Sequence, residues 1–262
     1  MIDLDAYLTR IGLAAQLRPD LASLEALHLA HLATIPFENL DVRLRRPILL
    51  DLESLEDKLV RRRRGGYCFE QNTLFASVLR TIGFEVQTLE ARVRPRGATA
   101  VLPRTHMTLR VSVDGRDYVS DVGFGGEGPL LPVPLDGALS EQPDAGYRVA
   151  KEGGEARALQ RRHAGEWLDQ YAFILTPALP VDFQVASHFT STFPSSPFLN
   201  TLTAQRSEPS ERHILRGRSY TVRIDGKETV REVTADEIAE LLRNQFGLDV
   251  SEEEARAALG EG

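Results

Sequence analysis

The chain has 262 residues, a formal net charge of −7, a hydrophobic fraction of 42% and a charged fraction of 26%. This length allows one large domain or two to three subdomains around a substantial core. The negative charge argues against a general nucleic-acid-binding protein, and no apolar run approaches the roughly 18 residues that a membrane span needs.

The first 83 residues show apolar side chains at helical spacing. One such run forms a helix face that Pro36 stops, and residues 54–60 indicate another helix. A further run follows Cys68 and ends at Gly83. We therefore expect a helical first part, with Cys68 in the first turn of its last helix.

Several charged residues and histidines of this part have structural interpretations. Residues 61–64 are consecutive arginines, for which a solvated helix end is favoured over an anion site. Arg64 adjoins two glycines, and a buried Glu38 is its expected partner, which would fix the following loop. His28 and His31 have the i, i+3 spacing of metal ligands, but no third ligand follows at recognisable spacing, so no metal is expected.

Cys68 is the only cysteine, and it lies in residues 64–70, which read RGGYCFE. The first turn of a helix has unpaired N–H groups and the positive end of the helix dipole, which stabilise thiolate over thiol. A catalytic nucleophile and a buried cysteine packed as a small hydrophobe are equally compatible with this stretch. The rest of the chain has to decide between them.

After Gly83 the apolar pattern changes to a period of two, which indicates strands. Asp114-Gly115 is a strong signal for a two-residue hairpin loop. Such a succession of short strands and turns predicts an antiparallel barrel or sandwich. The expected strands cover 84–93, 106–113, 118–122, 147–151, 156–161 and 167–175.

The last third combines a connecting segment, a hairpin and two helices. Residues 176–210 are rich in Pro, Ser and Thr, with interspersed phenylalanines, and we expect a connection with aromatic anchors. Two strands, 220–224 and 229–233, are joined across Asp225-Gly226. Two capping boxes predict helices that begin after Thr234 and Ser251.

A nucleophilic cysteine needs a base, and the base needs a group that orients it. If Asp114-Gly115 form the loop, residue numbers of paired positions sum to 229, which makes His106 and Asp121 diagonal neighbours on one face. The carboxylate would hold one ring nitrogen, and the other would face the Cys68 sulfur. Each residue alone is more often structural, but together with Cys68 they favour a catalytic triad.

Residues 123–128, GFGGEG, follow Asp121 directly. A glycine-rich loop lets backbone N–H groups approach a phosphate or an oxyanion. It is not a P-loop, because no Gly-Lys-Ser/Thr follows. From the loop alone, a simple turn of the barrel is slightly favoured.

Three motifs together resemble the arylamine N-acetyltransferase family: RGGYCFE at 64–70, PRTHM at 103–107 and DVGFGG at 121–126. PFEN at 36–39 is also similar, and the resemblance covers about residues 30 to 130. It implies an α+β fold with the arrangement of papain-like cysteine enzymes. The implied parts are a helical bundle over 1–83, a β-barrel over 84–186, and an interdomain segment with an α/β lid over 187–262.

The resemblance also implies chemistry. Acetyl-CoA would be the donor in a ping-pong cycle, and an arylamine, arylhydrazine or N-hydroxyarylamine would be the acceptor. The implied triad is Cys68, His106 and Asp121. The implied aromatic acceptor pocket is Phe37, Phe124 and Phe198. Gly125 and Gly126 would lie near the CoA pyrophosphate, with Arg216 and Arg218 as further candidates there.

Three other readings stay open. A transglutaminase-like or papain-like hydrolase has the same triad. An amide synthase that closes a macrolactam also has it. A non-catalytic binding module would keep only the fold. Measuring the hydrolysis of acetyl-CoA with and without an arylamine distinguishes the hydrolase from a transferase. A lone cysteine and an acidic N-terminus without a signal-peptide pattern predict a cytoplasmic protein. We also expect a monomer or homodimer that binds neither membrane nor nucleic acid.

Overall fold

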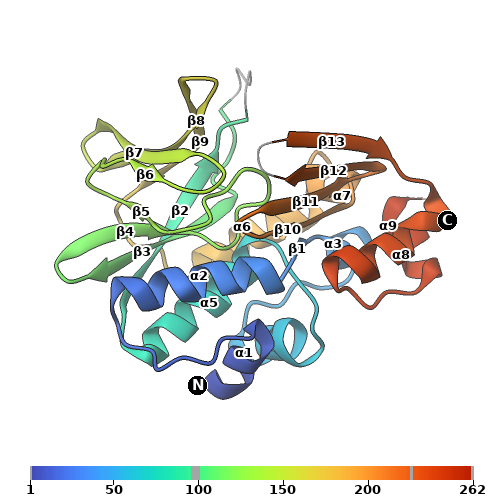
Figure 1. The fold of residues 1–262 in the computed structure, drawn as a ribbon. Helices are drawn as coiled ribbons and strands as arrows, with labels where there is room; N and C mark the ends of the chain where they lie inside the picture. Colours follow the sequence, from blue (N-terminus) through green and yellow to red (C-terminus); the bar gives the residue numbers. More distant parts are fainter. Residues whose placement is uncertain (1, 96–100, 225–226, 261–262) are drawn as a thin grey trace.

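A computed structural model describes residues 2–95, 101–224 and 227–260, and helices dominate its first part (Figure 1). The side chain of Asp20 caps the second helix by accepting from the Ser23 N–H at 2.8 Å. The helices are α1 (Leu4–Ile11), α2 (Leu21–Thr34), α3 (Leu40–Arg43), α4 (Leu52–Leu55), which continues as a π-helix (Glu56–Arg61), and α5 (Cys68–Ile82).

Eight antiparallel strands form the second part, in the order β5-β4-β3-β2-β9-β8-β7-β6. The sheet curls until β5 approaches β7, which makes a nearly closed barrel that lies above α2 and α5 in Figure 1. Its strands are β2 (Glu85–Val93), β3 (His106–Val113), β4 (Arg116–Ser120), β5 (Val133–Pro134), β6 (Ser140–Glu141), β7 (Gly146–Gly153), β8 (Ala156–His163) and β9 (Glu166–Ile174).

A second sheet, in the order β1-β10-β11-β12-β13, joins the two ends of the chain. Its edge strand β1 (Phe37–Glu38) comes from the helical part and pairs with β10, where Phe37 lies opposite Gln205. The other members are β10 (Thr203–Ser207), β11 (Glu211–Arg216), β12 (Ser219–Ile224) and β13 (Lys227–Glu232), and α8 (Ala235–Phe246) and α9 (Glu252–Leu259) pack beside them.

The predicted α+β class is confirmed, with helices first, an antiparallel barrel second and a sheet with helices last. The expected boundary after residue 83 coincides with the end of α5. Both predicted capping boxes are present, with Thr234 and Ser251 accepting from the N–H groups of Glu237 and Glu254. The expected loop Asp225-Gly226 lies outside the described residues.

The segment expected to be a connection contains two helices instead, α6 (Pro180–Thr192) and α7 (Pro197–Asn200). A proline is tolerated at the first helical position, and Phe183, Ala186 and Thr190 form a buried face at helical spacing. A helix with one buried face therefore lies in a segment whose Pro, Ser and Thr content predicted an irregular connection. The expected boundary between residues 186 and 187 falls inside α6.

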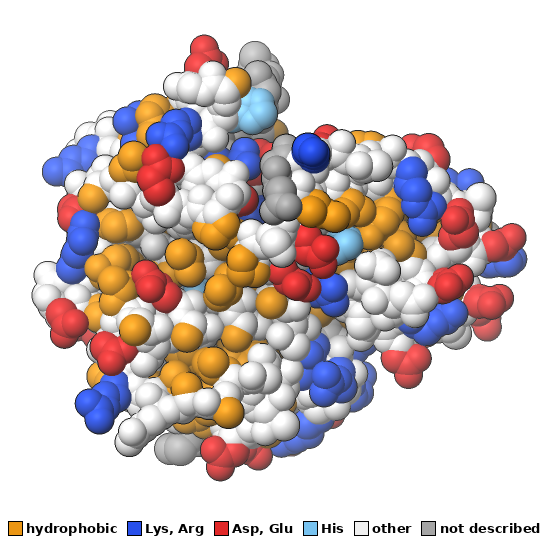
Figure 2. Space-filling view, viewed as in Figure 1, with side chains coloured by type: hydrophobic (Ala, Val, Ile, Leu, Met, Phe, Trp, Pro, Cys, Tyr) orange, Lys and Arg blue, Asp and Glu red, His pale blue; other side chains and the backbone are white. Residues whose placement is uncertain are grey.

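The surface carries charges of both signs. On the face seen in Figure 2, Lys and Arg side chains alternate with Asp and Glu around apolar areas, so neither sign forms a continuous field there. Among the described ranges, no helix is both long and apolar enough to cross a membrane.

Candidate active site

Cys68 is the first residue of α5, as the sequence predicts, and its side chain is buried. The preceding residue, Tyr67, donates its backbone N–H to Glu70 Oε2 at 3.1 Å, which closes the first turn. The sulfur lies 3.8 Å from the Thr105 carbonyl oxygen, next to the start of β3. The positive end of the helix dipole is thus turned toward the barrel hairpin.

The β3–β4 hairpin has the predicted register, with Val113 opposite Arg116 across the two-residue loop. His106 opens β3, and Asp121 follows the last residue of β4. His106 Nε2 lies 2.6 Å from Asp121 Oδ2. This bond leaves the other ring nitrogen, Nδ1, for the Cys68 sulfur.

The charges of this pair reinforce each other. Burial alone would lower the pKa of His106, but the Asp121 carboxylate and hydrogen bonds to Asp121 and Cys68 raise it to about 10. Burial would raise the pKa of Asp121, yet the His106 charge and several hydrogen bonds hold it below its ordinary value. An imidazolium–carboxylate pair therefore faces Cys68 at neutral pH.

Two residues that the sequence analysis did not assign to the site hold Asp121 in place. Asn72, one helical turn after the cysteine, donates to Asp121 Oδ1 at 2.9 Å and to the Met107 carbonyl at 2.7 Å. His28 Nε2 accepts from the Asp121 backbone N–H at 3.2 Å, and its Nδ1 lies 2.9 Å from the Leu130 carbonyl. Burial lowers the pKa of His28 to about 4, so the ring is neutral and donates through Nδ1.

The helical spacing from the cysteine could have indicated Asn72, because residues four apart share a helix face. The sequence spacing indicates His28 and His31 only as a possible pair of metal ligands. His31 instead lies 2.8 Å from the Tyr7 hydroxyl and 2.6 Å from Gln71 Oε1. Both histidines therefore use their ring nitrogens in internal hydrogen bonds.

Gly123 allows the hairpin to approach the cysteine. A Cβ at this position would lie 2.7 Å from the Cys68 Cα and 2.7 Å from Asn72 Nδ2, closer than such atoms can come. Its N–H donates to Asp121 Oδ1 at 3.0 Å. The first glycine of the loop thus lets Cys68 and the Asp121 carboxylate come close together.

A cavity of about 450 Å³ opens beside the sulfur, and both Cys68 and His106 line it. All three predicted pocket phenylalanines, Phe37, Phe124 and Phe198, lie in its wall. The sequence analysis missed further lining residues, among them Val93, Pro95 and Leu102. A larger cavity of about 630 Å³, between the loop before α4 and the helix α6, includes none of the three predicted triad residues.

The two predicted phosphate-site glycines differ in their surroundings. Gly125 lines the cavity, and a Cβ there would lie 2.7 Å from the Phe37 ring, so only glycine fits. Gly126 is held by β10, because its N–H donates to Gln205 Oε1 and its carbonyl accepts from Gln205 Nε2 at 2.9 Å.

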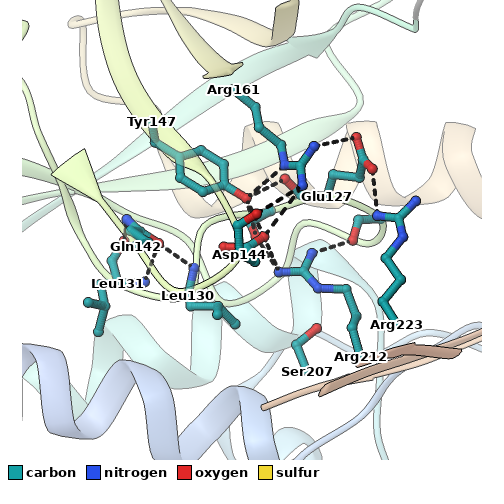
Figure 3. A network of polar contacts seen from close by, with 12 residues as sticks. Glu127, Leu130, Leu131, Gln142, Asp144, Tyr147, Arg161, Ser207, Arg212 and Arg223 are labelled. Atoms are coloured by element: carbon teal, nitrogen blue, oxygen red, sulfur yellow. Dashed lines mark hydrogen bonds and ion pairs between the residues drawn. The ribbon is translucent and has the colours of Figure 1, made fainter. Parts of the chain in front are cut away.

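The glycine-rich loop is also bound to a buried polar network (Figure 3). Arg212 of β11 donates to the carbonyls of Gly126 and Gly128, at 2.7 and 3.0 Å, and to Asp144 Oδ2 at 3.1 Å. Arg161 of the barrel points into the same cluster and lies 3.3 Å from Glu127. The C-terminal sheet and the barrel thus hold the loop from both sides.

Comparison with known proteins identifies the family of this chain. A family model described as N-acetyltransferase matches residues 20–255. The arylamine N-acetyltransferase of Mycolicibacterium smegmatis is 41% identical over 96% of this chain and 94% of its own length. The chain belongs to the arylamine N-acetyltransferase family.

The fold agrees with solved structures of arylamine N-acetyltransferases. The enzyme from Salmonella typhimurium superposes with a TM-score of 0.94 at 35% identity, over the whole of both chains. The Mycobacterium marinum enzyme, solved in complex with CoA, superposes with a TM-score of 0.92 at 34% identity, over 98% of each chain. The predicted family and the predicted enzyme class, an acyltransferase, are therefore confirmed.

In this arylamine N-acetyltransferase, a buried ion cluster lies behind the cysteine loop. Arg64 Nη2 lies 2.9 Å from Glu38 Oε1, which is the predicted pairing. Lys58 Nζ lies 2.7 Å from Glu70 Oε1 and 2.6 Å from an Asp41 carboxylate oxygen. Burial disfavours the charged form of Arg64, but Glu38 and Asp41 raise its pKa.

Arg64→Ala is expected to lower the free energy of unfolding by about 3 kcal/mol, because it leaves the Glu38 carboxylate buried without its partner. Urea denaturation of the purified acetyltransferase measures the change. Arg62→Ala is the matched control, since Arg62 and Asp57 form an exposed pair that contributes less than about 1 kcal/mol. Equal effects of the two substitutions would contradict a stabilising role for the buried pair.

Proposed function

We propose that this protein transfers an acetyl group from acetyl-CoA to an arylamine, an arylhydrazine or an N-hydroxyarylamine through an acetyl-cysteine intermediate. One observation carries the proposal: Cys68 and His106 line the same aromatic cavity, and His106 is bonded to Asp121 at 2.6 Å. The CoA complex of the Mycobacterium marinum relative supports CoA as the carrier.

In the first half-reaction, the Cys68 thiolate attacks the thioester carbonyl. The bond between the acetyl carbon and the CoA sulfur breaks, and CoA leaves as the thiol with the proton of the His106 imidazolium. Asp121 keeps the ring in one orientation and stabilises its charged form. Acetyl-cysteine and neutral His106 remain.

In the second half-reaction, the acceptor nitrogen attacks the acetyl-cysteine carbonyl. His106 accepts the proton that the nitrogen loses, and the Cys68 thiolate leaves. Thiolate is a better leaving group than alkoxide, which suits the return of the enzyme to its starting state. The imidazolium–thiolate pair is then restored for another donor.

The cavity wall supports an aromatic acceptor. Phe37 and Phe198 have ring centroids 6.0 Å apart, and the Phe124 ring lies 5.2 Å from that of His106. Flat aryl rings bind such walls through offset and edge contacts. We assign Phe37, Phe124 and Phe198 to acceptor binding, Gly125 and Gly126 to the donor side, and Glu38 and Arg64 to support of the cysteine loop.

A lone nucleophilic cysteine functions best in a reducing compartment, so we also propose that the enzyme acts in the cytoplasm, as a monomer or homodimer. No metal takes part in the proposed cycle. A macrolactam-forming amide synthase and a cysteine hydrolase share the same triad chemistry, and the choice of acceptor separates them from the proposed activity.

Intact mass spectrometry after addition of acetyl-CoA alone tests the proposal. The protein is expected to gain one acetyl group, which peptide mapping assigns to Cys68 and an aryl hydrazine then removes. A hydrolase would consume acetyl-CoA equally fast without the hydrazine. Transfer to the hydrazine without any adduct would point to direct attack in a ternary complex and would contradict the acetyl-cysteine intermediate.

A further inference from the structure

Arg216 is an unusual residue of the Cys68 cavity. Among the described residues that line this cavity it is the only Lys or Arg, and none of them is Asp or Glu. Its side chain is exposed at the end of β11, and its guanidinium forms no hydrogen bond or ion pair with any residue that the structure describes. A cation with free donors in the wall of a cavity whose described lining residues include no carboxylate is suited to bind an anion.

Arg216 lies beside the glycine-rich loop. Residues four apart on a strand share a face, so Arg216 is on the side of β11 from which Arg212 reaches the loop carbonyls. A Cβ added to Gly126 would lie 3.4 Å from Arg216 Nη2, which places the guanidinium next to the loop backbone. Unlike Arg212, which pairs with Asp144, it has no carboxylate partner in the part of the chain that the structure describes.

Two backbone N–H groups of the loop are already used within the protein. The N–H of Gly123 is bonded to Asp121 Oδ1, and the N–H of Gly126 is bonded to Gln205 Oε1. A phosphate at this edge of the cavity would therefore gain from a side-chain donor beside the loop. Arg216 supplies five N–H donors in a fork that matches phosphate oxygens.

We propose that Arg216 pairs with a phosphate group of the CoA donor and thereby selects phosphorylated thioesters over simple ones. This inference rests on the proposed function, since it assumes that the thioester reaches Cys68 through this cavity. It gives Arg216 a role in donor specificity, whereas His106 and Asp121 act at the reacting atoms.

Arg216→Gln is expected to raise KM about 10- to 150-fold for acetyl-CoA, the range of one charge-assisted hydrogen bond, with kcat little changed. The same variant is tested with S-acetyl-dephospho-CoA and with S-acetylpantetheine, which has no phosphate. KM for S-acetylpantetheine is expected to stay within about twofold, because the neutral donor offers Arg216 nothing to bind. Isothermal calorimetry with CoA alone measures the same loss as a higher Kd.

A higher KM for both phosphorylated donors would assign Arg216 to the pyrophosphate. A higher KM for acetyl-CoA alone would assign it to the ribose phosphate. Both outcomes support the inference. Arg216→Lys keeps the charge and is expected to retain part of the affinity. Arg18→Gln is the control, because Arg18 is exposed and does not line the cavity.

An equal rise in KM for all three donors, or an unchanged KM for each of them, would overturn the role of Arg216. That outcome differs from a failure of the proposed function, in which the wild-type protein itself would form no acetyl adduct on Cys68. An Arg216→Gln variant that forms the adduct with an unchanged KM for every donor would contradict only the role of Arg216 and not the proposed function.

Discussion

Cys68→Ser is expected to lower acetyl transfer to an arylamine by about 10³-fold or more, the usual effect of removing a nucleophile. A serine hydroxyl is not ionised by the His106 imidazolium at neutral pH, so the first attack becomes slow. Any acetyl-serine that forms is an ester with a poor leaving group, and it would accumulate. Stopped assays with acetyl-CoA and an aryl hydrazine, together with intact mass, measure both effects.

The substitution should leave the fold intact. Serine is slightly smaller than cysteine, and the contact between the sulfur and the Thr105 carbonyl oxygen is long, at 3.8 Å. A circular dichroism spectrum and a urea midpoint close to those of the wild type would show this. Transfer at nearly the wild-type rate by the folded variant would remove Cys68 from the mechanism.

Asp121→Asn is expected to lower transfer by about 10³- to 10⁴-fold with little change in shape, as for other triads that lose the orienting carboxylate. Without the carboxylate, burial dominates the pKa of His106, which falls below its ordinary value. The ring is then neutral at about pH 7 and no longer presents a positive charge to the Cys68 sulfur. Alkylation of Cys68 by iodoacetamide at that pH should slow in parallel with transfer.

Asp117→Asn is the matched control for this experiment. Asp117 lies on β4, the strand that leads into Asp121, but its carboxylate bonds to Arg110 and Ser112, away from the cavity. Its replacement should leave transfer and alkylation within about twofold of wild type, as expected for a surface site. An Asp121→Asn variant with the same behaviour as Asp117→Asn would exclude Asp121 from the triad.

The same pair predicts a pH dependence of stability. The pKa of His106 is raised in the folded state, so its contribution is fully present below the unfolded value and is lost as pH rises through about 10. The depressed pKa of Asp121 acts in the opposite range, and its contribution is lost as the solution becomes acidic. Urea midpoints of the wild type should therefore fall toward high pH more steeply than those of Asp121→Asn.

Local chemistry explains which parts of the site were predictable. A two-residue loop at Asp114-Gly115 determines the pairing of every residue on the hairpin, so the contact between His106 and Asp121 followed from residue numbers. The start of α5 at Cys68 followed equally from apolar spacing and the preceding glycines. Both features depend on residues close together in the chain.

The missed features depend on distant contacts. Phe37 pairs with Gln205 across most of the chain, and no local pattern encodes that partner. Helix α6 was hidden by its Pro, Ser and Thr content, because burial of one face outweighs weak helix propensity. His28 acts through a buried hydrogen bond to a backbone group, a role with no signature in spacing.

The pairing of β1 with β10 has a consequence for how the enzyme is made. On the ribosome, the helix that begins at Cys68 and the hairpin that carries His106 emerge well before residues 203–216. Until those residues leave the exit tunnel, Phe37 has no strand beside it and Gly126 lacks both Gln205 and Arg212. The nascent polypeptide therefore carries a reactive thiol in an unfinished pocket, which the last third of translation completes.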